Sequence, residues 1–195
     1  MAIAADTKSA PISGLSYHEN VLTSDILKAL HAETYGTLMK PTKWQIGPGG
    51  RRVQQYEYAY DYDAKDVPDS KIAPIPPVIQ KVITHLQSIG VLAGTVNQVI
   101  VNEYQPGQGI SPHKDHAKFG DQIASFSTGG AIPMTIADCK QSIEIWLQPN
   151  SLLVLSGHAR SECTHGIVAR KSDLRAGAYI LRRTRVSYTF RTFTP

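Results

Sequence analysis

The sequence predicts a mainly β protein, a sandwich or barrel preceded by helices. Helical periodicity is confined to the first half of the chain. From about Thr95 onward the chain breaks into short segments rich in Val, Ile, Thr, Tyr and Phe, separated by Gly, Pro, Asn and Ser. The sequence has no Walker loop and no Gly-x-Gly-x-x-Gly fingerprint, and helices do not alternate with strands. Both observations disfavour a doubly wound nucleotide-binding fold.

Two helices are expected in the first half. Thr23 or Ser24 caps a helix that runs to about Glu33, and its apolar residues recur at helical spacing. A second helix is expected from Pro77, which suits a first helical turn, to Ile89, and a glycine follows it as a stop signal.

The second half is expected to form seven strands that share β-branched and aromatic content and end at turn residues. They are residues 98–104, 123–128, 131–137, 143–148, 151–155, 166–169 and 185–192. A length of 195 residues suits one hydrophobic core. We therefore expect a single domain over residues 1–195, with helices and a substrate-recognition lid in 1–94 and the β core in 95–195.

Composition narrows the class of protein. Apolar residues make up 42% of the chain and charged residues 18%, which is typical of globular proteins. No apolar run is long enough to span a bilayer, no signal-peptide pattern opens the chain, and two cysteines cannot build a disulfide framework. We therefore expect a cytoplasmic monomer with no membrane partner.

The net charge of +4 hides an uneven distribution. From Ser151 to the end, eight Lys and Arg residues face only Glu162 and Asp173. A one-sided basic third suits an anionic ligand, large or small, and it also suits an ordinary solvated surface.

A basic and aromatic segment lies between the two expected helices. Arg51 and Arg52 are followed by Tyr58, Tyr60 and Tyr62. The three tyrosines alternate, so in an extended chain they share one face. This pattern is typical of an amphipathic strand or hairpin, and it also suits a lid whose rings stack on a flat substrate such as a nucleobase.

Three residues form a candidate metal site. His113 and Asp115 are two residues apart and point the same way in an extended segment. His165, fifty residues after Asp115, completes two histidines and one carboxylate, a facial triad that suits non-haem Fe(II) and leaves positions open for a co-substrate and O₂. A His-x-Asp pair also occurs by chance at surfaces. His158 competes with His165 as the distal ligand, but the Thr-His-Gly-Ile context favours His165.

The C-terminal strand supplies candidate co-substrate residues. Arg185 and Arg191 are six residues apart, so on a strand they face the same side, with Ser187 between them. Two guanidiniums inside a barrel are costly unless they meet anions, and arginine suits bidentate carboxylate binding. Asn102 and Tyr104, also two apart, can add an amide and a phenol to the same pocket. Together these residues predict a pocket for a small dicarboxylate.

At this point the sequence resembles the AlkB family of Fe(II)- and 2-oxoglutarate-dependent dioxygenases. The segments that carry the resemblance are 102–107, 110–115, 164–167 and 185–191, and 51–56 matches more loosely. The resemblance implies a double-stranded β-helix, or jelly-roll, core with helices packed on one side.

The resemblance also implies roles for the candidate residues. His113, Asp115 and His165 would bind Fe(II), and Arg185, helped by Tyr104, would pair with the distal carboxylate of 2-oxoglutarate.

Asn102 and Arg191 would contact the co-substrate near its metal-chelating end. The sequence departs from the founding bacterial pattern at Ser187, where that pattern has asparagine, and at Ala117, where it has an acidic residue that contacts the base. The stretch 119–123 looks closer to the tRNA-modifying branch.

The implied activity is hydroxylation of N-alkyl groups on nucleobases of DNA or RNA, which releases formaldehyde and repairs the base. The expected partner is nucleic acid with alkylated bases, either single-stranded or with the base flipped out. Two alternatives stay open: hydroxylation of a tRNA wobble modification or of a protein side chain, and a catalytically silent binding module. The complete set of candidate ligands argues against the silent module.

Overall fold

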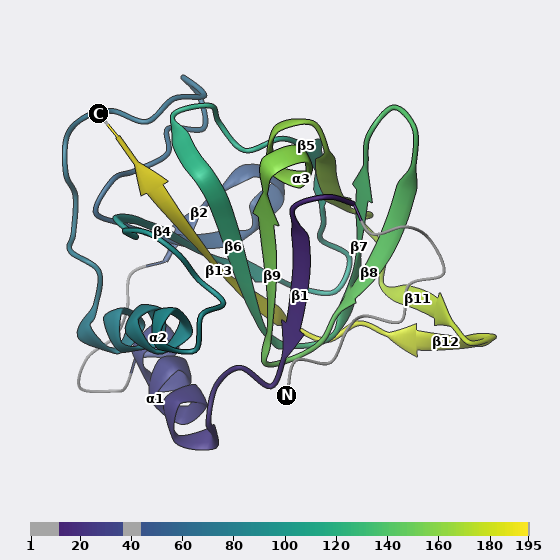
Figure 1. The fold of residues 1–195 in the computed structure, drawn as a ribbon. Helices are drawn as coiled ribbons and strands as arrows, with labels where there is room; N and C mark the ends of the chain where they lie inside the picture. Colours follow the sequence, from purple (N-terminus) through teal and green to yellow (C-terminus); the bar gives the residue numbers. More distant parts are fainter. Residues whose placement is uncertain (1–11, 37–43, 195) are drawn as a thin grey trace.

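The computed structural model describes residues 12–36 and 44–194. Its core is two antiparallel sheets packed face to face (Figure 1), which confirms the expected jelly roll. The larger sheet has the order β1-β9-β6-β13-β4-β3-β2. Its strands are β1 (Leu15–Glu19), β2 (Gln45–Ile46), β3 (Arg52–Tyr56), β4 (Gln98–Tyr104), β6 (Phe119–Gly129), β9 (Ser151–Ser156) and β13 (Arg185–Phe193).

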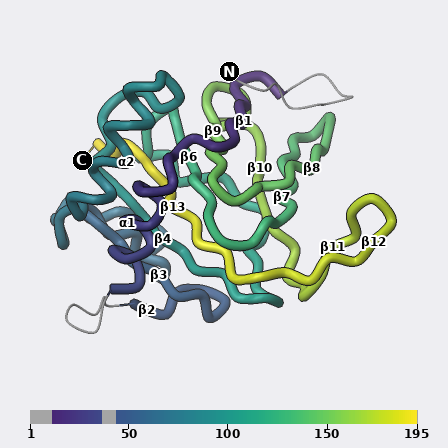
Figure 2. The backbone as a smooth tube through the Cα atoms, turned by 90° about the horizontal axis from the view of Figure 1, so that it is seen from below, coloured from purple at the N-terminus to yellow at the C-terminus, as the bar shows by residue number. Residues whose placement is uncertain are grey.

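The smaller sheet has the order β5-β10-β7-β8, and a separate hairpin pairs β11 with β12. These strands are β5 (Ile110–His113), β7 (Ile132–Ala137), β8 (Ser142–Leu147), β10 (Thr164–Ile167), β11 (Ser172–Arg175) and β12 (Ala178–Leu181). The β11–β12 hairpin projects away from the body of the protein (Figure 2). The expected strand at 166–169 instead begins at Thr164, which places His165 inside β10.

Two helices cover the outer face of the larger sheet. Helix α1 (Ser24–Tyr35) begins after Thr23, whose side chain accepts a hydrogen bond from the Ile26 N–H, and α2 (Pro77–Ser88) begins at its proline. Leu30 of α1 packs in one cluster with α2 and sheet residues. The helices match the expectation to within two residues at each end. A third, short helix, α3 (Gly157–Ser161), was not expected.

Along the central strands, alternate side chains form an apolar face that packs on the helices and a polar face that lies between the sheets. On β13, Val186, Tyr188 and Phe190 point to the helices and join their cluster. Arg185 and Arg191, offset by one residue, point between the two sheets. The jelly roll therefore places these two arginines in the space between its two sheets.

Three strands of the larger sheet, β1, β2 and β3, come from the first half of the chain. Their sequences lack the long β-branched runs of the second half, and the pairing of β1 with β9 spans more than 130 residues.

Within the described residues, no helix has the length and apolar character needed to cross a membrane.

Candidate metal centre and substrate cavities

Neighbouring strands bring the three candidate metal ligands together. His113 on β5 and His165 on β10 are direct cross-strand partners, with ring centroids 4.3 Å apart. Asp115 follows β5, and its Oδ2 lies 3.6 Å from Nε2 of His165. A Cβ at Gly166 would lie 2.9 Å from the backbone nitrogen of Pro112. Glycine after His165 therefore lets the two strands approach closely enough for the ligands to converge.

The pKa values of Asp115 and His165 suit these two candidate ligands to metal binding. Burial opposes ionisation of Asp115, but the charge of Arg191 and the two imidazoles outweigh it and hold the pKa of Asp115 at about 2. Burial lowers the pKa of His165 to about 4, so its ring is neutral at pH 7. His113 donates from Nδ1 to the Ser111 carbonyl oxygen at 2.9 Å, which leaves Nε2 with its lone pair.

This donor set fits Fe(II). Two neutral imidazoles and one carboxylate, clustered on one side, match the facial triad of non-haem iron oxygenases and leave room for a co-substrate and O₂. His158, the alternative distal ligand, does not lie in this cluster, since its Nε2 is hydrogen-bonded to Asp138 at 2.7 Å. The structure therefore places His165, and not His158, next to His113.

Arg191 contacts a metal ligand directly. Its Nη2 donates to Oδ1 of Asp115 at 2.5 Å, and its Nη1 donates to Oε1 of Gln98 at 3.2 Å. The sequence-based expectation placed Arg191 against the co-substrate, whereas here its charge is compensated by Asp115 because the two side chains converge from β13 and the end of β5. The Arg191 Nε and the Asn102 Oδ1 are buried without a hydrogen-bond partner among the described residues. These two atoms are available to a ligand.

An inner chamber lies between the metal ligands and Arg185. Its polar lining comes from strands of the larger sheet: Asn102, Tyr104, Ser125, Arg185, Ser187, Thr189 and Arg191. Arg185 is 1% exposed, and among the described residues it donates only to the Ser127 hydroxyl, from Nη2 at 2.8 Å and Nε at 3.3 Å. Its guanidinium lies 5.4 Å from the ring centroid of Tyr104. Across residues 12–36 and 44–194, no carboxylate forms an ion pair with it.

A buried cation without an anion is costly, so Arg185 calls for a negatively charged ligand. Burial also lowers its pKa, which shows the same lack of compensation. Ser187 keeps a hydroxyl in the chamber, 3.1 Å from the hydroxyl of Ser125. The chamber thus offers a guanidinium at one end and metal ligands at the other, the arrangement that a dicarboxylate such as 2-oxoglutarate needs.

An outer cavity of about 920 Å³ opens on the other side of the metal ligands. His113 and Asp115 line both spaces. The outer lining includes Arg51, Tyr60, Tyr62, Lys65, His116, Phe119 and the glycine-rich turn at 107–109. The rings of Tyr60 and Tyr62 meet edge to face with centroids 5.3 Å apart. Arg51 is fixed by a hydrogen bond from Nη1 to the Gly109 carbonyl oxygen at 3.0 Å.

Two of the expected substrate residues lie elsewhere. Tyr58 is buried and packs on Phe193, with ring centroids 4.7 Å apart. Glu57, at φ +65°, ends β3, and residues 58–62 form only isolated bridges at Tyr58 and Asp61 instead of a strand, so the alternation on which the shared face depended does not apply. Arg52 lies on the opposite side of the strand from Arg51 and forms a bidentate pair with Glu103 at 2.8 and 2.7 Å. Only Arg51, Tyr60 and Tyr62 of the expected set reach the cavity.

Arg160 is a positioning residue that sequence reasoning missed. From α3 it donates to the backbone oxygens of Asp115, His116 and Phe119, at 3.2, 2.8 and 3.1 Å. These bonds hold the loop that carries the metal-ligating carboxylate. The partners lie more than 40 residues away in the sequence and are backbone atoms, so no local motif marks them.

The fold and the site define an oxygenase that uses a metal and 2-oxoglutarate. Residues 24–191 match the family model described as the 2OG-Fe(II) oxygenase superfamily. Membership implies Fe(II), 2-oxoglutarate and O₂ as metal and co-substrates, and the protein is a dioxygenase.

Comparison with known proteins narrows the class. The chain is 34% identical over 161 residues to "tRNA (carboxymethyluridine(34)-5-O)-methyltransferase alkbh8" of Xenopus tropicalis. The aligned region covers 72% of this chain and 26% of that protein. The chain is 28% identical over 165 residues to "RNA demethylase ALKBH5" of Bos taurus, covering 78% and 38%. The chain thus spans about a quarter of the first relative. The solved structure of OsALKBH1 superposes with a TM-score of 0.69 at 16% identity, covering 94% of this chain and all of that one, and shows the shared fold. The chain belongs to the AlkB family within this superfamily.

Proposed function

We propose that this protein hydroxylates an alkyl group on a nucleobase of RNA, using Fe(II), 2-oxoglutarate and O₂. One observation carries the proposal most directly: Arg185 is buried without an anionic partner in the described chain, in a chamber that ends at His113, Asp115 and His165. The overall conversion balances as substrate C–H, O₂ and 2-oxoglutarate giving substrate C–OH, succinate and CO₂. Fe(II) bound by the three ligands supplies this oxidation chemistry.

The chain's own residues set up that reaction in two places. Arg185 and the Tyr104 phenol orient the distal carboxylate of 2-oxoglutarate in the inner chamber. Arg191 holds Oδ1 of Asp115, so Oδ2 faces His165 and the metal position. Asn102, through its unpaired buried oxygen, is available to the metal-chelating end of the co-substrate. The inner chamber therefore fixes one reactant before the other arrives.

The outer cavity suits a base that has left its stack. Tyr60 and Tyr62 offer aromatic faces, and Arg51 and Lys65 offer positive charge for the attached phosphates. The cavity reaches His113 and Asp115, so a base held there presents its substituent to the metal position. RNA is proposed over DNA because the relatives named above act on tRNA and RNA. Repair of alkylated DNA is the alternative on the same chemistry.

Two substituents fit this chemistry and give different products. An N-methyl group becomes a carbinolamine that releases formaldehyde, as expected for a demethylase like the second relative. A carbon-linked substituent on a wobble uridine keeps its new oxygen, and the first relative, whose name specifies carboxymethyluridine at position 34 of tRNA, favours this second candidate.

One assay separates these outcomes. Protein loaded with Fe(II), 2-oxoglutarate and ascorbate is incubated with methylated RNA and DNA oligonucleotides and with modified tRNA, and products are followed by mass spectrometry. Loss of a methyl mass with formaldehyde supports demethylation, and gain of one oxygen supports wobble hydroxylation. No mass change in any of the nucleic acids, with succinate formed only at the rate seen without nucleic acid, would contradict the nucleobase proposal.

A further inference from the structure

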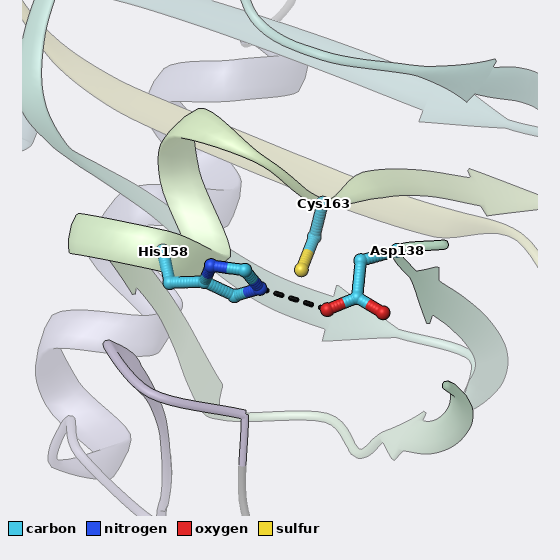
Figure 3. Close-up of side chains that lie close together, drawn as sticks. All are labelled: Asp138, His158 and Cys163. Atoms are coloured by element: carbon cyan, nitrogen blue, oxygen red, sulfur yellow. Dashed lines mark hydrogen bonds and ion pairs between the residues drawn. The ribbon is translucent and has the colours of Figure 1, made fainter. Parts of the chain in front are cut away.

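A second cluster of metal-binding side chains lies outside the site described above. Asp138, His158 and Cys163 point toward one another from three elements (Figure 3). Asp138 directly follows β7, His158 lies on α3, and Cys163 directly precedes β10. Pairing of β7 with β10 brings the two strand ends together, because Thr164 opposes Ala137 in the register.

The donor atoms are close enough to share one ion. An imidazole nitrogen of His158, a carboxylate oxygen of Asp138 and the Cys163 Sγ all lie within 4.8 Å of one another. The His158 Nε2 and Asp138 Oδ2 are 2.7 Å apart. Tetrahedral ligands about 2 Å from a zinc ion lie roughly 3.3 Å from each other. Insertion of an ion therefore requires the 2.7 Å pair to open by about half an ångström and any pair near the 4.8 Å limit to close by roughly 1.5 Å.

The cluster is fixed on its inner side and open on its outer side. Cys163 is 1% exposed, and the Asp138 side chain is 5% exposed. The other oxygen of Asp138, Oδ1, accepts from the backbone N–H groups of Lys140 and Gln141 at 2.8 and 2.9 Å. This leaves Oδ2 to face the cluster, as the outer hydrogen bonds of metal-ligating carboxylates do. The side chain of His158 is 43% exposed, so solvent has access to a fourth coordination position.

We propose that Asp138, His158 and Cys163 form a second metal site, selective for Zn²⁺, with water as the fourth ligand. Sulfur, nitrogen and oxygen ligands suit a borderline-soft divalent ion, and tetrahedral zinc accepts all three. A thiolate and a carboxylate together neutralise the ion's charge. The first site contains no sulfur ligand, so the two sites select different metals. Binding releases the thiol proton of Cys163 and replaces the hydrogen bond between His158 and Asp138.

A catalytic role for this cysteine does not fit. A nucleophilic thiolate must reach a substrate, and Cys163 is almost completely buried. The position of the cluster points to a structural role, because Cys163 directly precedes β10, two residues before His165 on that strand. A bound ion clamps the end of β7 to the start of β10, and so holds the strand that carries a ligand of the first site.

Cobalt provides the test, because Co²⁺ bound to a thiolate gives a charge-transfer absorption band in the near ultraviolet. Metal-free protein titrated with Co²⁺ alone is expected to develop this band with one equivalent, and Zn²⁺ is expected to abolish it by displacement. The band identifies the second site even when Co²⁺ also occupies the first, since His113, Asp115 and His165 supply no sulfur. Absence of the band at saturating Co²⁺ would overturn the proposal.

Matched cysteine variants locate the site. Cys163→Ala is expected to lose the band, whereas Cys139→Ala, which removes the exposed neighbouring thiol, keeps it. Loss of the band in Cys139→Ala, or its survival in Cys163→Ala, contradicts the assignment. If Cys163→Ala fails to fold by circular dichroism, His158→Gln on the exposed side provides the second variant. It is expected to weaken Zn²⁺ binding at least about tenfold, and unchanged affinity would count equally against the site.

The structural role has its own readout. Zn²⁺ is expected to raise the unfolding temperature of wild-type apoprotein and of Cys139→Ala, through preferential binding to the folded state. The same addition to His158→Gln is expected to give a smaller rise. An equal rise in both proteins would show that the stabilising zinc binds elsewhere and would refute the clamp.

Discussion

The inner chamber and the outer cavity share five lining residues, Asn102, Ile110, His113, Asp115 and Arg191, but the rest of their walls comes from different parts of the fold. The chamber is lined by alternate residues of central strands such as β4 and β13, which are hydrogen-bonded on both sides. The rest of the cavity wall comes largely from a segment after β3, the loop after β5 and a glycine-rich turn. Under the proposed function, the co-substrate is therefore held by rigid strands, and much of the contact with the nucleic acid is made by loops.

The largest expected effect breaks the chamber itself. Asp115→Asn removes the only carboxylate of the triad and leaves Arg191 without its ion-pair partner. We expect both succinate formation and nucleic-acid turnover to fall to background, because an amide neither carries the ligand charge nor compensates the arginine. Product analysis by mass spectrometry and iron content of the purified protein give the readout.

The matched control for that change is Asp121→Asn, an exposed carboxylate on β6. It alters net charge by the same amount and is expected to keep full activity and full iron content. Turnover by Asp115→Asn at the wild-type rate would remove Asp115 from the metal centre.

A buried histidine of the chamber is also expected to make the metal-free protein less stable against unfolding on mild acidification. The pKa of His165 is lowered from 6.5 to about 4 by burial, so the unfolded state takes up a proton between these values while the folded state does not. Stability of the metal-free protein therefore falls as pH drops from 6.5 toward 4, by up to a few kcal/mol at 1.36 kcal/mol per pKa unit. Asp115, with a lowered pKa of about 2, contributes its own loss only below about pH 4.

Urea unfolding at pH 7 and pH 5 measures this loss. His165→Gln removes the titrating ring and is expected to flatten the dependence over that range. An equally steep dependence in His165→Gln would assign the acid sensitivity to other groups and weaken the contrast between chamber and cavity.

Strand periodicity predicted the placement of the chamber residues on one inward face. Arg185 and Arg191 are six apart on one strand, and Asn102 and Tyr104 are two apart on its neighbour, so alternation alone places all four on the inward face. Alternation does not report which partner each side chain finds. The alternation therefore did not predict the contact between Arg191 and Asp115.

The cavity was harder to predict because its geometry depends on a turn and on distant partners. Residues 58–62 form isolated bridges at Tyr58 and Asp61 instead of a strand, so Tyr58 is buried while Tyr60 and Tyr62 face the cavity. The alternating tyrosines carried no sign that this segment does not continue the strand before it. The same alternation that predicted the inward face of the chamber also makes the side chains of Arg51 and Arg52 point to opposite sides of the sheet.

A third prediction sharpens the role of the chamber's buried cation. Arg185→Lys keeps the charge but loses the planar fork that pairs with a carboxylate. We expect the KM for 2-oxoglutarate to rise roughly 10- to 100-fold, since a hydrogen bond to a charged group contributes about 1.5–3 kcal/mol. The KM for the nucleic acid is expected to stay unchanged. A rise in both constants, or in neither, would argue against a site that binds the co-substrate alone.

The smallest expected effect is confined to the cavity. Tyr60→Ala and Tyr62→Ala each remove one ring from its wall, and a base–aromatic contact contributes about 1–3 kcal/mol. We expect kcat/KM for the nucleic acid to fall roughly 5- to 100-fold, while succinate formed without nucleic acid stays at the wild-type rate. Tyr58→Phe, a conservative change in the core ring that packs on Phe193, is the control and is expected to leave both rates unchanged. A matching loss of nucleic-acid-independent succinate in Tyr60→Ala would mean that the cavity wall also shapes the chamber, and the two regions would then act as one.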